Sequence, residues 1–379
     1  MEILTEKIDL NNLDKSNWET FKFDEIAQKI SKTIDPNETT LETYIGLEHI
    51  DAEDLHIRRK GSPDDVKGGK LRCYPGDIIF GKRRAYQRKA AIVDFDGICS
   101  AHAFVLRANS EVIDPKLFPF FLHSDQFMHL MVDISVGGLS PTINWGDLKH
   151  QEFLLPPKDQ QAQLSKLLWA MDEVIEKEKE VLGKMKRYDL SQLKHYFYDD
   201  KTSERLKLKN IVSIKKGKKP PVLLEKGEGL PYCTAKYLRT GEIESIVPEE
   251  AWKKSVKINE REILVLWDGS NAGEMFFGKE GFLASTMCKL EMTNNEFLKD
   301  FVFQFLRFKT NDIKRATVGS AIPHVDPGMI ENIQIPKLDN ERQVSIVELF
   351  NSLKVNIVLI KSKIRSSKSL QKSIINQIF

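Results

Sequence analysis

The sequence PKDQQAQLSKLLWAMDEVIEKEKEVLGKMKRYDLSQLKHYF, residues 157–197, decides the organisation of the whole chain. Its apolar residues recur at heptad spacing with Lys and Glu between them, which is the pattern of one long helix with an apolar seam. About 38 helical residues would span roughly 57 Å, more than one small domain can cover. The seam consists of Leu164, Leu168, Met171, Ile175, Leu182 and Met185, and a parallel track consists of Leu167, Val174, Val181 and Tyr188.

A second stretch of the same design closes the chain, from about Asp339 to Phe379. Gln161 and Gln343 stand 182 residues apart, and so do Phe197 and Phe379. Repeated landmarks in a fixed order predict an internal duplication. The second seam consists of Ile346, Phe350, Leu353, Ile357, Ile360, Ile364, Ile374 and Ile378.

The residues between the two stretches also repeat. The segment PYCTAKYL corresponds to TYIGLEHI, EILVLW corresponds to DIIF, and the turn VGSAIPHVD corresponds to VGGLSPTIN. The predicted fold class is therefore α+β, with two mixed globular domains joined by two long helices that pair as an antiparallel coiled coil, in a pseudo-twofold duplication. The alternative is that each helix packs on its own domain. The predicted boundaries are 1–156, 157–199, 200–338 and 339–379.

Size and composition limit the possible functions. A chain of 379 residues with 41% apolar residues predicts two or more folded domains. The net charge of +2 restricts any nucleic-acid contact to local basic patches. Four scattered cysteines without a CxxC pair favour neither a zinc site nor disulfides, and fit a reducing cytoplasm. No run approaches the ~20 apolar residues of a membrane span, so we expect a protein without a membrane contact.

Catalytic signatures are missing from the sequence. It has no GxxxxGK[ST] loop, GxGxxG turn, HExxH, GxSxG elbow or Asn-Pro-Pro-aromatic run. His123 and His129 are six residues apart and do not share a helix face as metal ligands would. The sequence thus favours a binding protein without a catalytic or metal site of its own.

The strongest positive signal is GKRRAYQR, at the expected tip of a hairpin between two predicted strands. Arg can bind guanine O6 and N7, Gln can bind adenine N6 and N7, and Lys can neutralise phosphate, so we expect a DNA contact here. The alternative is a solvated hairpin end. The residues are Lys82, Arg83, Arg84, Tyr86, Gln87, Arg88 and Lys89, with a second basic cluster at Arg58, Arg59 and Lys60.

The second half differs at the same place. Its corresponding tip, WDGSNAG with Asn271, is not basic, so the two halves are expected to read different sequences. The two Gly-rich turns can approach a partner closely and offer hydrogen bonds, although a purely structural turn is the alternative. The cations of the second half are Lys215, Lys216, Lys218, Lys219, Lys236 and Arg239, and the polar turn residues are Ser140, Thr142, Asn144, Ser320 and His324.

These landmarks, with G-D-I-I, G-I-C-S-A-H and L-P-P-x-x-x-Q-x-x-L before the long helix, resemble the specificity subunit of type I restriction-modification enzymes over essentially the whole chain. The corresponding IPKLDNERQ departs by an insertion, for which we expect a local loop difference. The resemblance implies two target recognition domains, each reading half of a split, asymmetric double-stranded DNA sequence, and helices that act as a spacer.

The resemblance also implies partners. Two methyltransferase subunits would dock on the helices and transfer a methyl group from S-adenosylmethionine to adenine N6, and restriction subunits using ATP and Mg would cleave unmethylated DNA. This chain would itself bind no cofactor. The rival interpretations are a coiled-coil interaction scaffold without DNA recognition, and a self-sufficient nuclease or methylase.

Overall fold

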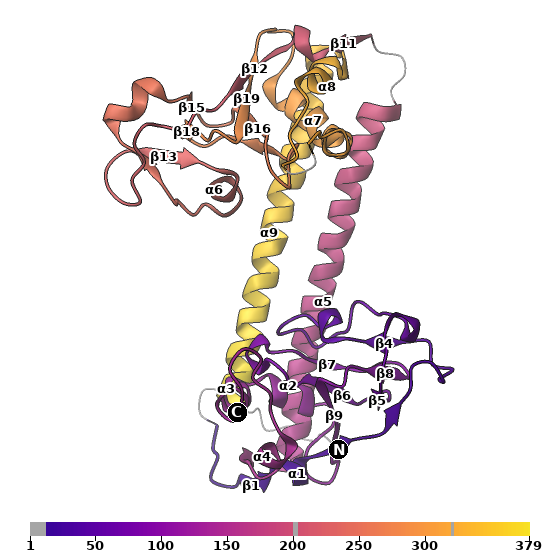
Figure 1. Ribbon diagram of the computed structural model, residues 1–379. Coiled ribbons are helices and arrows are strands. Elements are labelled where there is room, and N and C mark those ends of the chain that lie inside the picture. Colours follow the sequence, from indigo (N-terminus) through magenta and orange to yellow (C-terminus); the bar gives the residue numbers. More distant parts are fainter. Residues whose placement is uncertain (1–12, 200–203, 320–321) are drawn as a thin grey trace, which may run out of the picture. The chain divides into compact units, whose positions relative to one another are not determined.

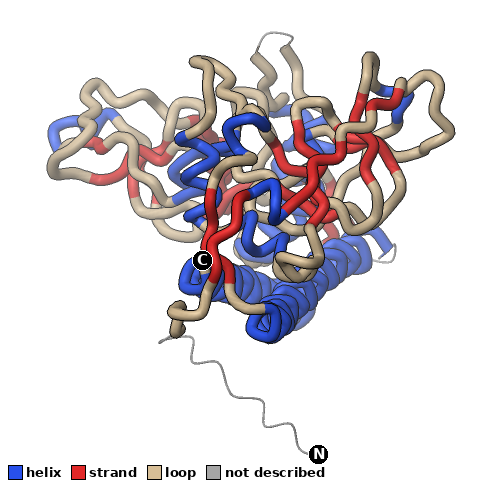
Figure 2. The backbone as a smooth tube through the Cα atoms, turned by 90° about the horizontal axis from the view of Figure 1, so that it is seen from below, coloured by secondary structure: helices blue, strands red, loops and turns tan. Residues whose placement is uncertain are grey.

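The computed structural model describes residues 13–199, 204–319 and 322–379. The chain forms two compact units, which combine helices and strands (Figure 2). Unit 1 is the chain up to Glu180 together with Ser362–Phe379, and unit 2 is Val181–Lys361. The long helices α5 (Lys158–Lys194) and α9 (Asn340–Ile378) each contribute residues to both units (Figure 1).

The described part of unit 1 contains three small sheets, with strand orders β2-β9-β6-β7, β3-β5-β8-β4 and β1-β10. Its strands are β1 (Glu19–Lys22), β2 (Ala27–Ile30), β3 (Thr33–Ile34), β4 (Tyr44–Ile45), β5 (Lys70–Cys73), β6 (Ile78–Gly81), β7 (Ala90–Ile92), β8 (Gly97–Cys99), β9 (Ala103–Ala108) and β10 (Glu152–Leu155). Its short helices are α1 (Phe23–Ile26), α2 (Phe118–His123), α3 (Asp125–Asp133) and α4 (Trp145–Leu148).

Unit 2 contains the sheets β12-β19-β16-β17, β14-β13-β18-β15 and β11-β20. Its strands are β11 (Arg205–Lys207), β12 (Val212–Lys216), β13 (Leu230–Cys233), β14 (Ile246–Val247), β15 (Lys257–Ile258), β16 (Ile263–Leu266), β17 (Met275–Phe277), β18 (Gly281–Leu283), β19 (Met287–Met292) and β20 (Gln334–Pro336). Its helices are α6 (Ala235–Thr240), α7 (Lys299–Arg315) and α8 (Pro327–Asn332).

The two units repeat one topology with a single change. The first sheet and the two-stranded sheet match strand for strand. In the remaining sheet of unit 1, β8 pairs parallel with β4 and antiparallel with β5. In unit 2, β18 likewise pairs parallel with β13 and antiparallel with β15. The fourth strand lies on opposite edges, because β3 pairs with β5 whereas β14 pairs with β13. The duplication therefore preserves the central strands and varies an edge strand.

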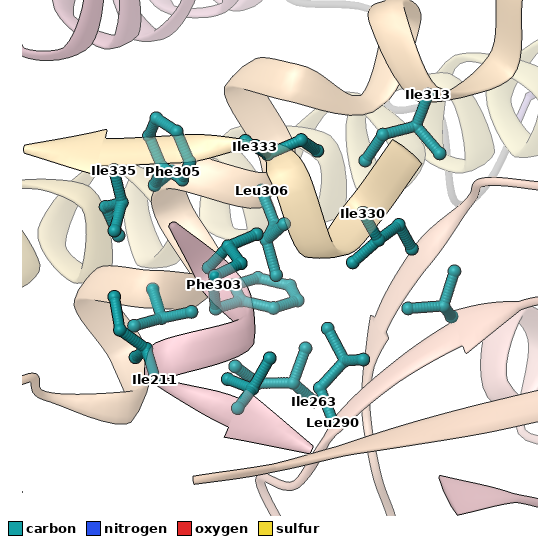
Figure 3. Close-up of a cluster of buried hydrophobic side chains, with 14 of the residues drawn as sticks. Ile211, Ile263, Leu290, Phe303, Phe305, Leu306, Ile313, Ile330, Ile333 and Ile335 are labelled. Atoms are coloured by element: carbon teal, nitrogen blue, oxygen red, sulfur yellow. The ribbon is translucent and has the colours of Figure 1, made fainter. Parts of the chain in front are cut away.

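Each unit has an aromatic-rich core. In unit 1 the ring of Phe121 lies 5.0 Å from that of Phe153 and 5.3 Å from that of Phe127. In unit 2, Figure 3 shows Ile263 of β16 and Leu306 of α7 in one cluster of buried side chains, and both are fully buried. Truncating such a side chain to Ala typically costs about 2–5 kcal/mol. These cores hold the first sheet of each unit against its helices.

The helical spacing of apolar residues in PKLFPFFLHSDQFMHLMVDI, residues 115–134, predicts one helix, and the structure corrects this to two helices. Ser124 separates α2 from α3 with an extended backbone, at ψ 148°. Its hydroxyl accepts a hydrogen bond from the Phe127 amide at 3.2 Å and so caps α3. The break is a capping signal that apolar periodicity alone does not reveal.

The long helices pair within each unit and also pack on the globular part of that unit. In unit 1, Gln371 donates to the Leu168 carbonyl and Ser367 to Glu178, so the α9 segment runs antiparallel to α5. The same α5 segment packs with Phe120 of α2. In unit 2, Phe350 of α9 shares a core with Phe197. Both interpretations that the sequence left open therefore apply: the helices pair, and each also packs on a globular domain. The predicted fold class is confirmed.

The predicted seam is only partly buried. Leu164, Leu168 and Ile175 are buried in unit 1, and Ile346 and Phe350 in unit 2. The structure shows that the parallel track is not part of the buried seam, because all four of its side chains are exposed. They are Leu167, Val174, Val181 and Tyr188. Within the seam, Ile378 is also buried. The half-buried seam residues are Met171, Leu182, Met185, Leu353, Ile357, Ile360, Ile364 and Ile374.

A buried glutamine anchors the first turn of each long helix. The Gln161 side chain accepts from the Asp114 amide at 2.6 Å and donates to the carbonyls of Val112 and Pro156. Gln343 makes the same three bonds, accepting from the Leu298 amide at 2.8 Å and donating to two carbonyls. Since both amides are buried, all their hydrogen-bonding groups need these partners. The glutamines fix where each helix leaves its domain.

The sequence predicts no membrane-spanning run, and one helix among the described residues does not fit this prediction. By length and composition α9 could cross a membrane, with a mean hydropathy of 1.4 over its most apolar window. The expectation overlooked it because Ser, Asn, Glu348 and Lys354 interrupt the apolar residues, so that no long unbroken run exists. Ile346 and Phe350 of α9 lie in the core of unit 2, but only 17% of the apolar window is buried, and Val355, Val358 and Leu359 are exposed.

Candidate nucleic-acid interface

The predicted hairpin exists, and its loop projects the basic residues from the first sheet of unit 1. Strands β6 and β7 pair antiparallel, with Phe80 opposite Ala90. The loop turns through a short 3₁₀ segment, Ala85–Gln87, in which Ala85 is buried. Arg84 and Arg88, on either side of this segment, adopt the left-handed conformation, at φ 58° and 52°. Non-glycine residues rarely adopt it.

The loop is bound to the Gly-rich turn that the sequence also singled out. The Arg84 amide donates to the Pro141 carbonyl at 2.7 Å, and the Ile143 amide donates to the Lys82 carbonyl at 3.0 Å. The Arg84 guanidinium donates to the Ser140 hydroxyl at 3.1 Å. Two predicted DNA-contacting segments therefore form one surface, which we call the hairpin–turn surface of unit 1 (residues 82–87 and 136–144).

Two basic residues that were not predicted, Lys29 and His102, lie near this surface. Lys82 lies over the Phe104 ring, and Lys29 lies over the Trp145 ring. Burial and the nearby charge of Lys29 lower the pKa of Lys82. Burial and then the charge of Arg83 lower the pKa of His102, which favours a neutral imidazole. Only spatial proximity identifies Lys29 and His102, since neither belongs to a basic run.

The structure moves Arg88 away from the predicted contact. Its guanidinium lies 2.8 Å from Glu53 and 2.6 Å from Asp125. Lys372 of α9 binds the same two carboxylates, at 2.8 and 3.5 Å. Although burial alone would raise the pKa of Glu53, the hydrogen bond from Lys372 and the two cations lower it. Arg88 thus ties the base of the hairpin to the carboxyl end of α9.

Lys89 is also turned inward, because its ammonium donates to the Leu47 carbonyl at 2.6 Å. Tyr86 and Gln87 stay in the loop, with Tyr86 exposed and Gln87 half-buried. On the neighbouring turn Thr142 is half-buried, and Asn144 is exposed at the start of α4. Arg83, Arg84 and Tyr86 are therefore the most accessible predicted side chains of this loop.

The second basic cluster serves a different purpose. Arg58 binds Asp54 at 3.1 Å and Glu176 of α5 at 2.7 Å. Although burial alone would raise the pKa of Asp54, hydrogen bonds from Arg58 and Lys179 lower it well below its usual range. Arg59 pairs with Asp51, and Lys60 pairs with Asp94. Since carboxylates bind all three cations, they connect loops to each other and to α5 rather than forming a free basic patch.

Unit 2 repeats the geometry of the hairpin–turn surface. The Gly269 amide donates to the Pro323 carbonyl at 2.9 Å, as Arg84 does to Pro141, and the Val325 amide donates to the Trp267 carbonyl at 2.9 Å. Isolated bridges join Asp268 to His324 and Arg83 to Thr142. The hairpin–turn surface of unit 2 comprises residues 267–272 and 318–326, except that Ser320, predicted to bind DNA, and residue 321 lie outside the described residues.

The charge of the second surface is different. Asp268 takes the place of Arg83, and Lys216 pairs with Asp268 at 2.9 Å. Lys218, Lys219, Asn271 and His324 are exposed. The remaining predicted cations are paired with carboxylates: Lys215 with Glu291, Lys236 with Glu244, and Arg239 with Glu274.

Among the described residues, one group could hold a metal ion by distance. The ligand atoms of His56, Asp172 and Glu176 lie within 4.8 Å of one another. His56 Nε2 already pairs with Asp172 at 2.8 Å, and Arg58 neutralises Glu176. The group is better described as an ion-pair network between the loop after β4 and α5. All four cysteines are buried as free thiols.

A duplicated α+β domain that presents the same loop-and-turn backbone twice, with different side chains, defines a protein with two related recognition surfaces. The family model of the type I restriction modification DNA specificity domain matches the chain twice, at residues 15–186 and 200–367. The chain belongs to this family. The predicted family and its internal repeat are thereby confirmed.

Individual relatives agree with this assignment. The type I restriction enzyme MjaVIII specificity subunit of Methanocaldococcus jannaschii is 38% identical over 178 residues, which are 46% of this chain and 41% of that protein. The EcoDI specificity subunit of Escherichia coli is 29% identical over 170 residues, 43% of this chain and 37% of that protein. The chain thus spans less than half the length of these two relatives. The type I restriction-modification system S subunit from M. genitalium has the same fold, with a TM-score of 0.60 at 17% identity over 96% of each chain.

Proposed function

We propose that this chain is the sequence-reading subunit of a cytoplasmic type I restriction-modification complex, and that each unit reads one half of a bipartite, asymmetric site in double-stranded DNA. The observation that carries the proposal is the repeated hairpin–turn surface, whose backbone hydrogen bonds agree while its side chains differ. Two linked readers gain affinity when their spacing matches the target and lose it when the spacing is wrong.

Unit 1 has the chemistry to read a duplex. Arg83 and Arg84 are exposed on a hairpin narrow enough to enter a groove. Arg84 keeps a left-handed backbone where its counterpart in unit 2 is Gly269. Such strain costs of the order of 1–3 kcal/mol and tends to occur at functional positions. An arginine retained there supports a direct role in binding.

In this proposal the chain itself is not catalytic. Burial raises the pKa of Cys233 and of Cys288 to about 12, so neither thiol is available as a nucleophile. The partner subunits would use S-adenosylmethionine to methylate adenine N6, and ATP with Mg to restrict unmethylated DNA.

We assign partner docking to α5. Leu167, Val174, Val181 and Tyr188 follow one face of this helix at seven-residue intervals, and all four are exposed. A row of exposed apolar side chains along a long helix suits burial by another subunit. The two methyltransferase subunits are the proposed occupants, and the restriction subunits would join the assembly.

The test uses the purified chain, duplex DNA selected by it from a random pool, and S-adenosylmethionine, with and without the methyltransferase subunits of its system. We expect sequence-specific binding by the chain, and methyl transfer only when the partners are present. Failure to enrich any sequence would contradict the recognition function. Methyl transfer by the chain alone would contradict the division of labour.

A further inference from the structure

The Gly-rich turn of unit 1 carries an apolar side chain at its apex. Leu139 is 96% exposed, whereas the neighbouring Ser140 is held by the Arg84 guanidinium. Val136, at the base of the turn, and Tyr86, on the adjoining hairpin, are exposed as well. Isolated apolar residues are common on protein surfaces. Here, however, three of them lie among the cations of one surface.

The turn presents Leu139 on a constrained backbone. The Val136 amide donates to the Thr142 carbonyl at 3.0 Å, and the Thr142 amide donates back at 2.9 Å, which closes the base of the turn. Gly137 adopts φ 114°, a conformation that glycine allows. The Arg84 amide binds Pro141 on the other side of Leu139. Leu139 therefore projects from a turn that is fixed at both ends.

Unit 2 repeats the hydrogen-bonded base of this turn. Val318 and His324 exchange the corresponding pair of hydrogen bonds, at 2.9 and 2.8 Å, and close the base of the second turn. Ile322, within that turn, is 66% exposed. Ile322 corresponds in sequence to Ser140, and residue 321, which corresponds to Leu139, lies outside the described residues.

We propose that Leu139 is a wedge that inserts between neighbouring base pairs of the half-site bound by unit 1. The inference rests on the proposed function. Leu and Ile are among the residues that proteins insert into DNA to unstack and kink a base step, with nearby cations on the phosphates. Arg83 and Arg84 would hold the duplex while Leu139 leaves water for the base stack.

The wedge would add specificity without a hydrogen bond to a base. Unstacking is easiest at pyrimidine–purine steps, so the half-site would favour such a step at the position that Leu139 reaches. Arg84 connects the two tasks, because its guanidinium also fixes the residue next to Leu139. The wedge would therefore give unit 1 a second means of recognising its half-site, in addition to contacts with base edges.

The test compares the full-length chain with its Leu139→Ser and Leu139→Met variants on duplexes selected by the wild type from a random pool. The duplexes carry 2-aminopurine at successive positions of each half-site, and its fluorescence rises when the base is unstacked. Val132→Ser is the matched control, because Val132 is 41% exposed on α3, outside the hairpin–turn surface.

We expect the wild type to raise the fluorescence at one step of the half-site read by unit 1. Leu139→Ser should abolish that rise and weaken binding roughly tenfold. The salt dependence and the melting temperature should stay unchanged, because the substitution alters neither a group that binds phosphate nor a core residue. Leu139→Met should retain most of the signal, and Val132→Ser all of it.

Other outcomes separate the two proposals. Specific binding with no fluorescence rise, or with a rise that Leu139→Ser preserves, would overturn the wedge and leave the proposed function intact. A smaller salt slope in Leu139→Ser would also overturn it, since a wedge neutralises no phosphate. Failure of the wild type to select any sequence would overturn both proposals.

Discussion

The two hairpin loops have the same backbone and opposite chemistry. Both turn over the same number of residues, and both are bound to the following Gly-rich turn by corresponding amide-to-carbonyl bonds. Residues 82–89 carry five cations, whereas residues 267–274 carry two carboxylates and no cation. Two left-handed positions are Arg84 and Arg88 in unit 1 but Gly269 and Gly273 in unit 2.

The comparison separates what the fold requires from what recognition requires. Glycine satisfies the left-handed turn without strain, so the turn conformation itself does not require the arginines of unit 1. The hydrogen-bonded frame must position the loop in both units, whereas the exposed side chains can differ. Substitutions in the frame should thus act alike in both units, and substitutions on the surface should act on one half-site.

The largest expected effect concerns the shared frame. Gln161→Leu and Gln343→Leu each leave a buried amide and two buried carbonyls without a partner, which should destabilise the protein by roughly 2–5 kcal/mol. Denaturant unfolding with hydrogen exchange should place each loss in its own unit. Gln163→Leu, on an exposed position of α5, is the control. A large loss for one glutamine only would break the equivalence of the units.

The next effect concerns the cations of unit 1. Replacing Lys82, Arg83 and Arg84 by Ala should weaken DNA binding roughly a hundredfold. The log–log salt slope should fall by roughly 0.9 for each phosphate that the variant no longer neutralises. Titrations at several salt concentrations measure both quantities, with Arg59→Ala as the control, since Arg59 pairs with Asp51. An unchanged affinity and slope would remove this hairpin from the interface.

A single substitution separates strain from binding. Arg84→Gly copies Gly269, so the relief of left-handed strain should offset the greater entropy of the unfolded chain, and the free energy of unfolding should change by less than about 1 kcal/mol. DNA affinity should still fall severalfold, because the variant lacks the guanidinium. If stability instead fell by several kcal/mol, Arg84 would be a folding residue and the contrast with Gly269 would carry no functional meaning.

The smallest expected effect is a pH dependence confined to unit 1. The hydrogen bond to Asp172 raises the pKa of His56 above its usual value. The ion pair should thus stabilise unit 1 fully below about pH 6.5, the ordinary His value, and its contribution should be lost as the pH rises through the raised pKa. Because the pair is partly exposed, its contribution is below about 1 kcal/mol.

His56→Gln should remove this dependence, which unfolding measured between pH 5 and pH 8 would detect. Unit 2 has Gly241 at the position 185 residues later and should not show it. A pH profile that is identical in wild type and variant would mean that the His56–Asp172 pair contributes nothing measurable.

The sequence predicts the architecture well because duplication and heptad spacing are long-range patterns. It also locates the hairpin, since a Pro-Gly turn and two apolar strands flank the basic run. It does not predict which cations of that run are exposed. Arg88 and Lys89 turn inward because Asp125 and the Leu47 carbonyl, remote in sequence, offer them partners.

Other features depend on tertiary packing in the same way. The exposed track on α5 has the same spacing as the buried seam, so periodicity alone cannot separate the two. Leu139 lies within a motif that the sequence marks for its polar residues, and only its exposure draws attention to the leucine. The domain boundaries at 156, 200 and 338 remain predictions, because the compact units divide within the long helices.

The most direct test of the account is a genome-wide map of methyladenine in cells that carry the complete system. One strain would have the wild-type chain, and the other a chain whose residues 1–150 are replaced by the corresponding unit of another family member. We predict that one half of the methylated sequence changes while the other half and the spacing between them stay the same. A change in both halves would contradict the central claim that each unit reads its own half-site.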